Sequence, residues 1–178
     1  MKEIEVKILD IERVSLESRL TTLGAELRFD DEIDALFFDT PGGLIGGARN
    51  LLRLRREGTK VVLTFKEYVA NGKAKVRQEY ETVVADFDAM SAILKHLGLH
   101  PVLTVRKHRT TYELPGARFS FDRHTGELAY IPEFLEIEAD SAKLLDENVA
   151  RLEFKASDCR PWGLPELIAH YSSPTLDH

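Results

Sequence analysis

Alternation of apolar and polar residues runs through most of the chain and predicts a protein built mainly from β-strands. The opening Glu3-Ile4-Glu5-Val6-Lys7 shows the pattern, because its aliphatic side chains must point to one face of a strand and its charged side chains to the other. Runs of this kind, rich in β-branched and aromatic residues, are found at 2–9, 33–39, 51–57, 60–68, 74–84, 102–114, 117–123 and 133–139.

Helical spacing of apolar residues appears in fewer places. The pattern over 12–23 stops at Gly24, and that over 87–97 stops at Gly98, as is typical of helix ends. Two further segments, 141–152 and 165–171, complete the set. Eight strands with few helices predict an α+β fold, in which an eight-stranded antiparallel sheet closes into a β-barrel and the helices pack outside.

The polar face of these strands carries charges of both signs in equal number. In strand after strand, one face is apolar and the other carries acids and bases. The acids are Glu3, Glu5, Glu79, Glu81, Asp122, Glu136 and Glu138. The bases are Lys7, Arg53, Arg55, Lys66, Arg77, Lys107 and Arg109. If the sheet closes with its apolar face under the helices, these charges line the interior.

Composition narrows the class of protein further. A chain of 178 residues is long enough for one domain with a sizeable core, so we treat residues 1–178 as a single domain. A formal charge of -6 argues against a general nucleic-acid binder, and the single Cys159 excludes a disulfide framework or a zinc finger. No apolar stretch is long enough to span a membrane, and the first ten residues have no signal-peptide core. We therefore expect a soluble cytoplasmic protein.

Charges in an interior need partners, because each unpaired buried ion costs several kcal/mol. Internal ion pairs would meet this need, and so would a highly charged ligand. A polyphosphate with divalent metal ions fits, since Arg and Lys hold phosphoryl oxygens and paired carboxylates hold Mg²⁺ or Mn²⁺. A barrel that holds an apolar ligand would require an apolar interior, which the alternation contradicts.

The ordered set of charged motifs resembles the CYTH superfamily, the triphosphate tunnel metalloenzymes. The opening Glu-x-Glu-x-Lys matches the signature of that family at Glu3, Glu5 and Lys7. The resemblance covers residues 1 to about 140, extends more weakly to the C-terminus, and is strongest to the class IV adenylyl cyclase-like branch of prokaryotes. The other motifs follow in the expected order: Arg53-Leu54-Arg55, Thr64-Phe65-Lys66, Arg77-Gln78-Glu79-Tyr80-Glu81, Lys107-His108-Arg109, Asp122 and Phe134-Leu135-Glu136-Ile137-Glu138.

The resemblance implies an eight-stranded tunnel that binds a triphosphate with Mg²⁺ or Mn²⁺. It implies metal ligation by Glu3, Glu5, Glu136 and Glu138, with help from Asp122 or the pair Glu79 and Glu81, and phosphate binding by the seven bases. Lys7 is implied to bind phosphate or to activate the nucleophile, so Lys7 and Glu5 are the candidate catalytic residues. Arg106 competes with Lys107 for the inward position, and we favour Lys107 because it shares a face with Arg109.

The sequence leaves open which organic group, if any, the triphosphate carries. The inward face offers no clear aromatic or amide set for a nucleobase, which favours hydrolysis of tripolyphosphate or a nucleoside triphosphate. The alternatives are a class IV adenylyl cyclase that makes cyclic AMP from ATP, and a module that binds polyphosphate or nucleotide without turnover. Both Glu-x-Glu pairs together with Lys7 favour an enzyme. The cyclase-like relatives suggest a homodimer.

Overall fold

The computed structural model describes residues 4–71 and 75–172, with the backbone alone for 69–71 and 75–77. The described chain forms two compact units. Unit 1 comprises residues 32–71 and 75–106, and unit 2 comprises residues 4–31 and 107–172. Strands β2 (Glu26–Asp39) and β6 (His100–Leu114) each contribute to both units. The prediction of a single folding domain is not tested by this division and stays a prediction.

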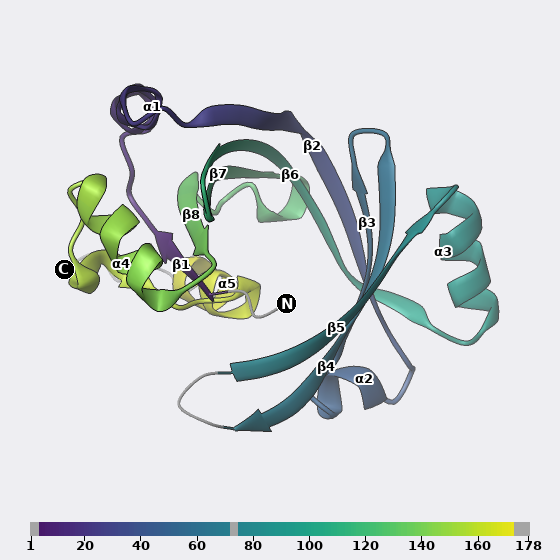
Figure 1. Cartoon of the computed structure of the whole chain (residues 1–178). Helices are drawn as coiled ribbons and strands as arrows, with labels where there is room; N and C mark the ends of the chain where they lie inside the picture. The colour runs from purple at the N-terminus through teal and green to yellow at the C-terminus, as the bar shows by residue number, and fades with distance from the viewer. Residues whose placement is uncertain (1–3, 72–74, 173–178) are drawn as a thin grey trace. The chain divides into compact units, whose positions relative to one another are not determined.

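The strands form one nine-stranded sheet in the order β5-β4-β3-β2-β6-β7-β8-β1-β9 (Figure 1). Every pairing whose register is known is antiparallel, which suits the alternating sequence. The remaining strands are β1 (Ile4–Ile8), β3 (Leu51–Glu57), β4 (Lys60–Asn71), β5 (Lys75–Val84), β7 (Ala117–Thr125), β8 (Phe134–Ala139) and β9 (Cys159–Arg160).

The predicted closed barrel of eight strands was wrong. The hydrogen-bonded order has two ends, β5 and β9, and in the described residues no pairing joins them, so the sheet stays open. The ninth strand, Cys159–Arg160, is two residues long and therefore too short to leave an alternating pattern in the sequence. Alternation specifies which face each side chain occupies, but it does not specify whether the last strand pairs with the first.

All four predicted helices are present, as α1 (Arg13–Thr22), α3 (Phe87–His96), α4 (Ala142–Arg151) and α5 (Leu164–Ser172). The sequence did not predict the four-residue α2 (Leu44–Gly47) or the short 3₁₀ turns Gly126–Leu128 and Ala156–Asp158. None of the helices in the described ranges is both long and apolar enough to cross a membrane.

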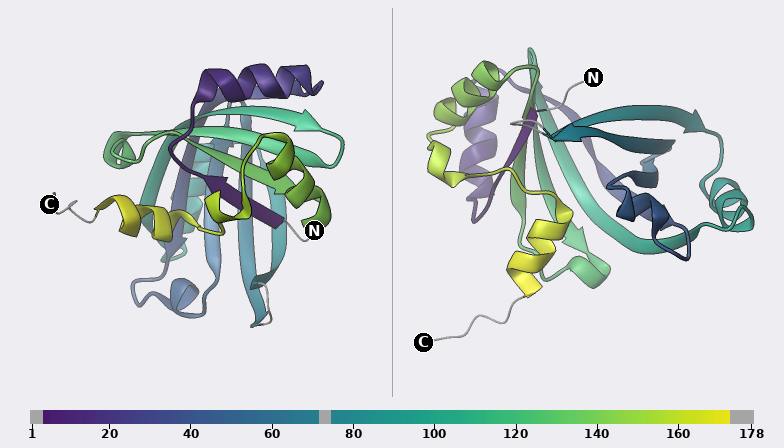
Figure 2. Two further views of the ribbon diagram at one scale, coloured as in Figure 1. Left: turned by 90° about the vertical axis from the view of Figure 1, so that its left-hand side faces the viewer. Right: turned by 90° about the horizontal axis from the view of Figure 1, so that it is seen from below.

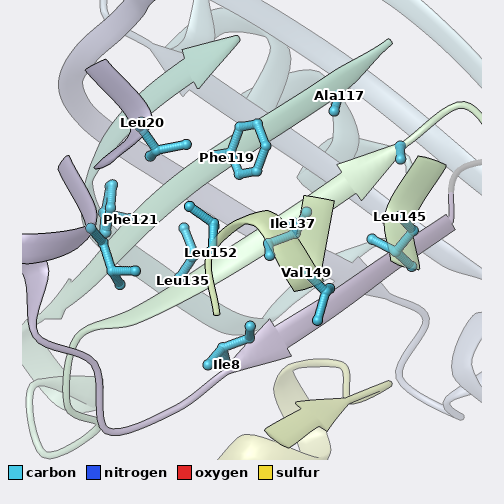
Figure 3. Packing of buried hydrophobic residues seen from close by; sticks show 12 residues of the cluster. Ile8, Leu20, Ala117, Phe119, Phe121, Leu135, Ile137, Leu145, Val149 and Leu152 are labelled. Carbon is cyan, nitrogen blue, oxygen red and sulfur yellow. The ribbon is translucent and has the colours of Figure 1, made fainter. Parts of the chain in front are cut away.

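The core of unit 2 lies between its strands and two helices. Helix α4 packs against β8, β1 and β7 (Figure 2). Its Leu145 and Val149, with Leu20 of α1, cover the apolar face of these strands (Figure 3). Leu16 of α1 belongs to the same buried cluster. The strands contribute Ile8, Ala117, Phe119, Phe121, Leu135, Ile137 and Ala139. Because successive side chains alternate, this packing commits the charged residues of β1, β7 and β8 to the opposite face.

The core of unit 1 uses the same arrangement with one helix. Helix α3 begins after Asp86, whose carboxylate accepts a hydrogen bond of 2.6 Å from the backbone N–H of Ala89. Its buried Leu94 packs with Leu52 and Leu54 of β3 and with Phe38 of β2. The opposite face of β3 and β4 therefore carries Arg53, Arg55 and Lys66.

Asp39 at the end of β2 holds the glycine-rich segment that follows it. Its carboxylate accepts hydrogen bonds from the backbone N–H groups of Thr40 at 2.7 Å, Ile45 at 2.9 Å and Gly46 at 2.9 Å. The Gly46 and Ile45 amides, aided by Thr40, outweigh the effect of burial and lower the pKa of Asp39. One carboxylate thus orders the start of α2.

Replacing Asp39 by Ala is expected to lower the melting temperature at pH 7 by about 2–4 °C, because three amides lose their acceptor. A group with a depressed pKa stabilises the folded state above its unfolded pKa, and this contribution is lost as pH falls through the folded value. The difference between wild type and Asp39→Ala should therefore shrink at pH 3. Thermal unfolding at both pH values measures it, and an equal difference at both would contradict the role of the carboxylate.

Candidate functional site

The charged face of unit 2 is organised in rows that run across the strands. Residues directly opposite each other on paired strands share a face. Lys7 of β1 lies opposite Glu136 of β8, which lies opposite Ser120 of β7. The hydroxyl of Ser120 lies 3.0 Å from that of Thr111 on β6. This first row therefore extends over β1, β8, β7 and β6.

A two-residue turn, Pro115-Gly116, sets the alignment of β6 with β7. Gly116 has a φ of 73°, which favours glycine, and a Cβ there would lie 2.8 Å from Leu144 Cδ2. Such a turn places Leu114 opposite Ala117, and counting back along both strands places Arg109 opposite Asp122. The contacts of these two side chains agree with that register.

Asp122 is the centre of a buried ion cluster. Only 1% of its side chain is exposed, and Arg109 binds it with both Nε–Oδ1 and Nη2–Oδ2 at 2.6 Å. Lys107 Nζ lies 2.5 Å from the same Oδ2. The two cations thus share one carboxylate, and the planar fork of Arg109 fixes its orientation.

Glu136 joins this cluster to Lys7. Its Oε1 accepts a hydrogen bond of 3.0 Å from Arg109 Nη2, and its Oε2 lies 2.7 Å from Lys7 Nζ. Lys7 also lies 3.3 Å from Glu5 Oε1. Three cations are therefore arranged around two buried carboxylates, with the more exposed Glu5 at the margin.

These contacts shift the pKa values in opposite directions. Burial alone would raise the pKa of Asp122 and of Glu136. Lys107 and Arg109 reverse that effect at Asp122, and Arg109, Lys7 and Lys107 reverse it at Glu136, so both pKa values lie below their usual range. Burial would lower the pKa of Lys7, yet Glu136 and Glu5 raise it. The pKa of Lys107 is lowered, because burial and the adjacent Arg109 outweigh the attraction of Asp122.

A second row contains two carboxylates of the predicted metal site. Glu5 of β1 lies directly opposite Glu138 of β8, and Glu138 lies opposite Arg118 of β7. Arg118 lies 3.3 Å from Glu138 and 3.2 Å from Glu113. The Glu5 side chain is 41% exposed, so one carboxylate of this row faces solvent. Glu3, the third acid of the opening motif, lies outside the described residues.

Unit 1 has its own charged face on β3, β4 and β5. Arg53 lies opposite Thr64, and Lys66 lies opposite Glu79 at 2.5 Å between the charged atoms. Glu81 accepts a hydrogen bond of 3.2 Å from Thr64. Arg55 lies 3.2 Å from Glu57. Arg77 pairs through its backbone with Tyr68, but its side chain lies outside the described residues.

The structure thus brings the predicted residues together as two sets. Unit 2 groups Lys7, Lys107, Arg109, Asp122 and Glu136, with Glu5 and Glu138 beside them. The predicted residues of unit 1 whose side chains are described are Arg53, Arg55, Lys66, Glu79 and Glu81. Lys107 occupies the inward position, whereas Arg106 is 65% exposed and pairs with Asp34. In the part of the chain that the structure describes, no three His, Cys, Asp or Glu side chains converge as metal ligands.

Two aromatic residues on the charged face were missed by the sequence analysis. Phe134 lies opposite Asp122, and its ring is 5.9 Å from that of His124 between centroids. Both side chains are buried, so neither offers an exposed ring for stacking. Position 134 shares parity with Glu136 and Glu138, which is the signal that places its side chain on this face.

Comparisons with known proteins agree with this arrangement. The family model of the CYTH domain matches residues 1–156. A protein of Methanocaldococcus jannaschii named "Putative adenylate cyclase" is 27% identical over 151 residues, which are 83% of this chain and 82% of that one. A solved structure from Pyrococcus horikoshii has a TM-score of 0.75 at 26% identity and covers 93% of this chain and 99% of its own.

A more distant solved structure shares the fold. It is a Hippeastrum protein described as a putative adenylyl cyclase with a dominant triphosphatase activity. It has a TM-score of 0.65 at 16% identity and covers 99% of each chain. The match of the family model over most of the chain shows the class: this chain belongs to the CYTH domain family.

Proposed function

We propose that the protein is a divalent-metal-dependent enzyme that hydrolyses a triphosphate, either inorganic tripolyphosphate or a nucleoside triphosphate. The observation that carries the proposal is the buried cluster of unit 2, where Lys7, Lys107 and Arg109 surround Asp122 and Glu136. Bases held this closely by carboxylates are pre-organised to bind phosphoryl oxygens, and such binding is most of what phosphoryl transfer requires.

Each residue of the cluster has a proposed role. Arg109 and Lys107 donate hydrogen bonds to phosphoryl oxygens, while the carboxylate of Asp122 fixes the orientation of both side chains. Lys7, held between Glu136 and Glu5, binds phosphate as an ammonium and stabilises the charge that develops during transfer. The attacking group is water, and cleavage of a terminal phosphoanhydride bond releases orthophosphate.

Glu5 and Glu138 are the proposed ligands of Mg²⁺ or Mn²⁺. Carboxylates directly opposite each other on paired strands repel, and a divalent cation relieves that repulsion. Their oxygens are the donors that hard cations prefer. Glu3 is proposed as a third ligand from the same motif. When bound, the metal supplies charge neutralisation of the phosphate and orientation of the attacking water.

Hydrolysis is preferred to cyclisation for a structural reason. Cyclisation requires a place for the sugar and base, and the aromatic residues described on the unit 2 face, Phe134 and His124, are buried. The triphosphatase described for the Hippeastrum protein offers a precedent on this fold. The name of the Methanocaldococcus jannaschii relative supports the alternative, a cyclase that forms cyclic AMP and pyrophosphate from ATP.

The test is a substrate panel followed by identification of the products. Tripolyphosphate, ATP and thiamine triphosphate are incubated with Mg²⁺ or Mn²⁺, and the products are separated by chromatography. Orthophosphate as the main product supports the proposal. Cyclic AMP as the main product from ATP establishes the cyclase instead. Binding without any product establishes a non-catalytic module.

The basic residues of unit 1 are themselves expected to bind tripolyphosphate. The double variant Arg53→Ala, Arg55→Ala should weaken tripolyphosphate binding by about 1.5–3 kcal/mol per arginine, the size of a hydrogen bond to a charged group. Calorimetry measures the affinity. Arg56→Ala is the matched control, because Arg56 is on the same strand but pairs with Asp34 and stacks on Phe87. Unchanged affinity in the double variant would show that these arginines serve only their neighbouring acids.

A further inference from the structure

The edge strand of unit 2 adds a basic residue to the first row. Strand β9 pairs with β1, and their register places Arg160 directly opposite Lys7. The side chain of Arg160 therefore leaves the backbone on the same face of the sheet as the side chains of Lys7 and Glu136, one strand nearer the edge of the sheet. The family model matches residues 1–156, so the match does not reach Arg160.

Two like charges opposite each other on paired strands are unfavourable unless anions compensate them. The charge of Lys7 is compensated by the carboxylates of Glu136 and Glu5. Arg160, in contrast, makes no ion pair with any carboxylate of the residues described. The row therefore ends in a cation without a counter-charge.

The guanidinium of Arg160 is nevertheless held in place. Its Nη1 donates to the carbonyl oxygens of Ser157 at 2.6 Å and Cys159 at 3.3 Å, and its Cζ lies 5.7 Å from the centroid of the Trp162 ring. Within the described chain, Nε and Nη2 make no hydrogen bond. An oriented arginine with unused donors is a ready binding group for an anion, and its planar fork suits phosphate.

We propose that Arg160 binds a phosphoryl oxygen of the polyphosphate beside Lys7. The proposal rests on the proposed function, because it takes the triphosphate as the ligand of this face. Adjacent strands lie about 4.8 Å apart, so the two cations are spaced to hold different phosphoryl groups of one chain. Arg160 thereby favours a triphosphate over a single phosphate.

The test is calorimetric titration of the full chain at fixed ionic strength in a buffer that contains Ca²⁺. Tripolyphosphate and orthophosphate are titrated in separate experiments. Arg160→Gln should weaken tripolyphosphate binding roughly 10- to 100-fold, as expected for the loss of a charge-assisted hydrogen bond. Orthophosphate binding should change less. Arg151→Gln on α4 is the control, because it removes the same charge from the same unit and should leave the affinity unchanged.

A purely structural role for Arg160 predicts a different result. Its contacts with the Ser157 carbonyl and Trp162 would then matter only for stability, so Arg160→Gln would lower the melting temperature and leave the affinity unchanged, which overturns the proposal. If Arg160→Gln does not fold, Arg160→Lys keeps the charge and should still lose part of the affinity; full affinity would contradict a need for the arginine fork. Failure of the wild type to bind tripolyphosphate would refute the proposed function itself.

Discussion

Replacing Asp122 by Asn is expected to lower the free energy of unfolding by about 3–5 kcal/mol. The change removes the charge that Lys107 and Arg109 share and leaves two buried cations with Glu136 as their remaining counter-ion. Asn has nearly the same volume, so lost packing does not explain the effect. Urea denaturation without metal or phosphate measures it, and a loss below about 1 kcal/mol would show that the cluster is solvated like a surface pair.

Two further measurements assign the loss to the unpaired cations. The double variant Asp122→Asn, Lys107→Met should recover part of the stability, because it removes one of the cations left without a partner. Asp34→Asn is the control, since its contacts with Arg56 and Arg106 are more exposed and should cost less than about 1 kcal/mol. Because the pKa of Asp122 is depressed, its contribution is present above about pH 4 and is lost as pH falls through the folded value.

The strands and their faces could be predicted from sequence because alternation is a local signal. Lys7, Glu136 and Asp122 were placed on the charged face by parity alone, and the structure puts them in contact or in one cluster. The segment 26–32 of β2 was not predicted, because its side chains are mostly exposed and charged and its short alternation ends in three consecutive acids, Asp30, Asp31 and Glu32. Closure of the sheet was predicted wrongly, since it depends on whether two edge strands pair.

Side-chain partners could be predicted only where a turn fixes the register. The two-residue turn Pro115-Gly116 is enough to place Arg109 opposite Asp122 by counting. The connection from β7 to β8 is long and contains a 3₁₀ turn, so the pairing of Asp122 with Phe134 could not be counted. The pairing of Lys7 with Glu136 joins two strands that are far apart in the sequence, so it depends on the tertiary structure alone.

The sequence predicted inward acids and bases in equal number and left open what compensates their charges. Equal numbers of inward acids and bases required either internal pairing or a charged ligand. In unit 2 the structure supplies internal pairing for Asp122, Glu136 and Lys7. It leaves Glu5 half-exposed and Arg160 without a carboxylate, and these two residues are therefore the places where a ligand adds most.

The two Glu-x-Glu motifs offer a way to separate catalysis from stability. Glu136 is held by Lys7 and Arg109, whereas Glu5 is 41% exposed and contacts Lys7 at 3.3 Å. Glu136→Gln should therefore lose both activity and stability. Glu5→Gln removes a proposed metal ligand from the surface of the cluster and should leave the unfolding free energy within about 0.5 kcal/mol of wild type.

Glu5→Gln is expected to lower turnover of the active triphosphate on the order of 100- to 1,000-fold, because a metal contributes several kcal/mol to the stabilisation of charge in the transition state. The Mn²⁺ concentration needed for half-maximal rate should rise, since an amide oxygen is a weaker ligand than a carboxylate. Glu12→Gln, on the connection before α1, is the charge-matched control and should behave as wild type. Steady-state rates over a range of Mn²⁺ concentrations test both effects, and wild-type turnover with an unchanged metal requirement would remove Glu5 from the metal site.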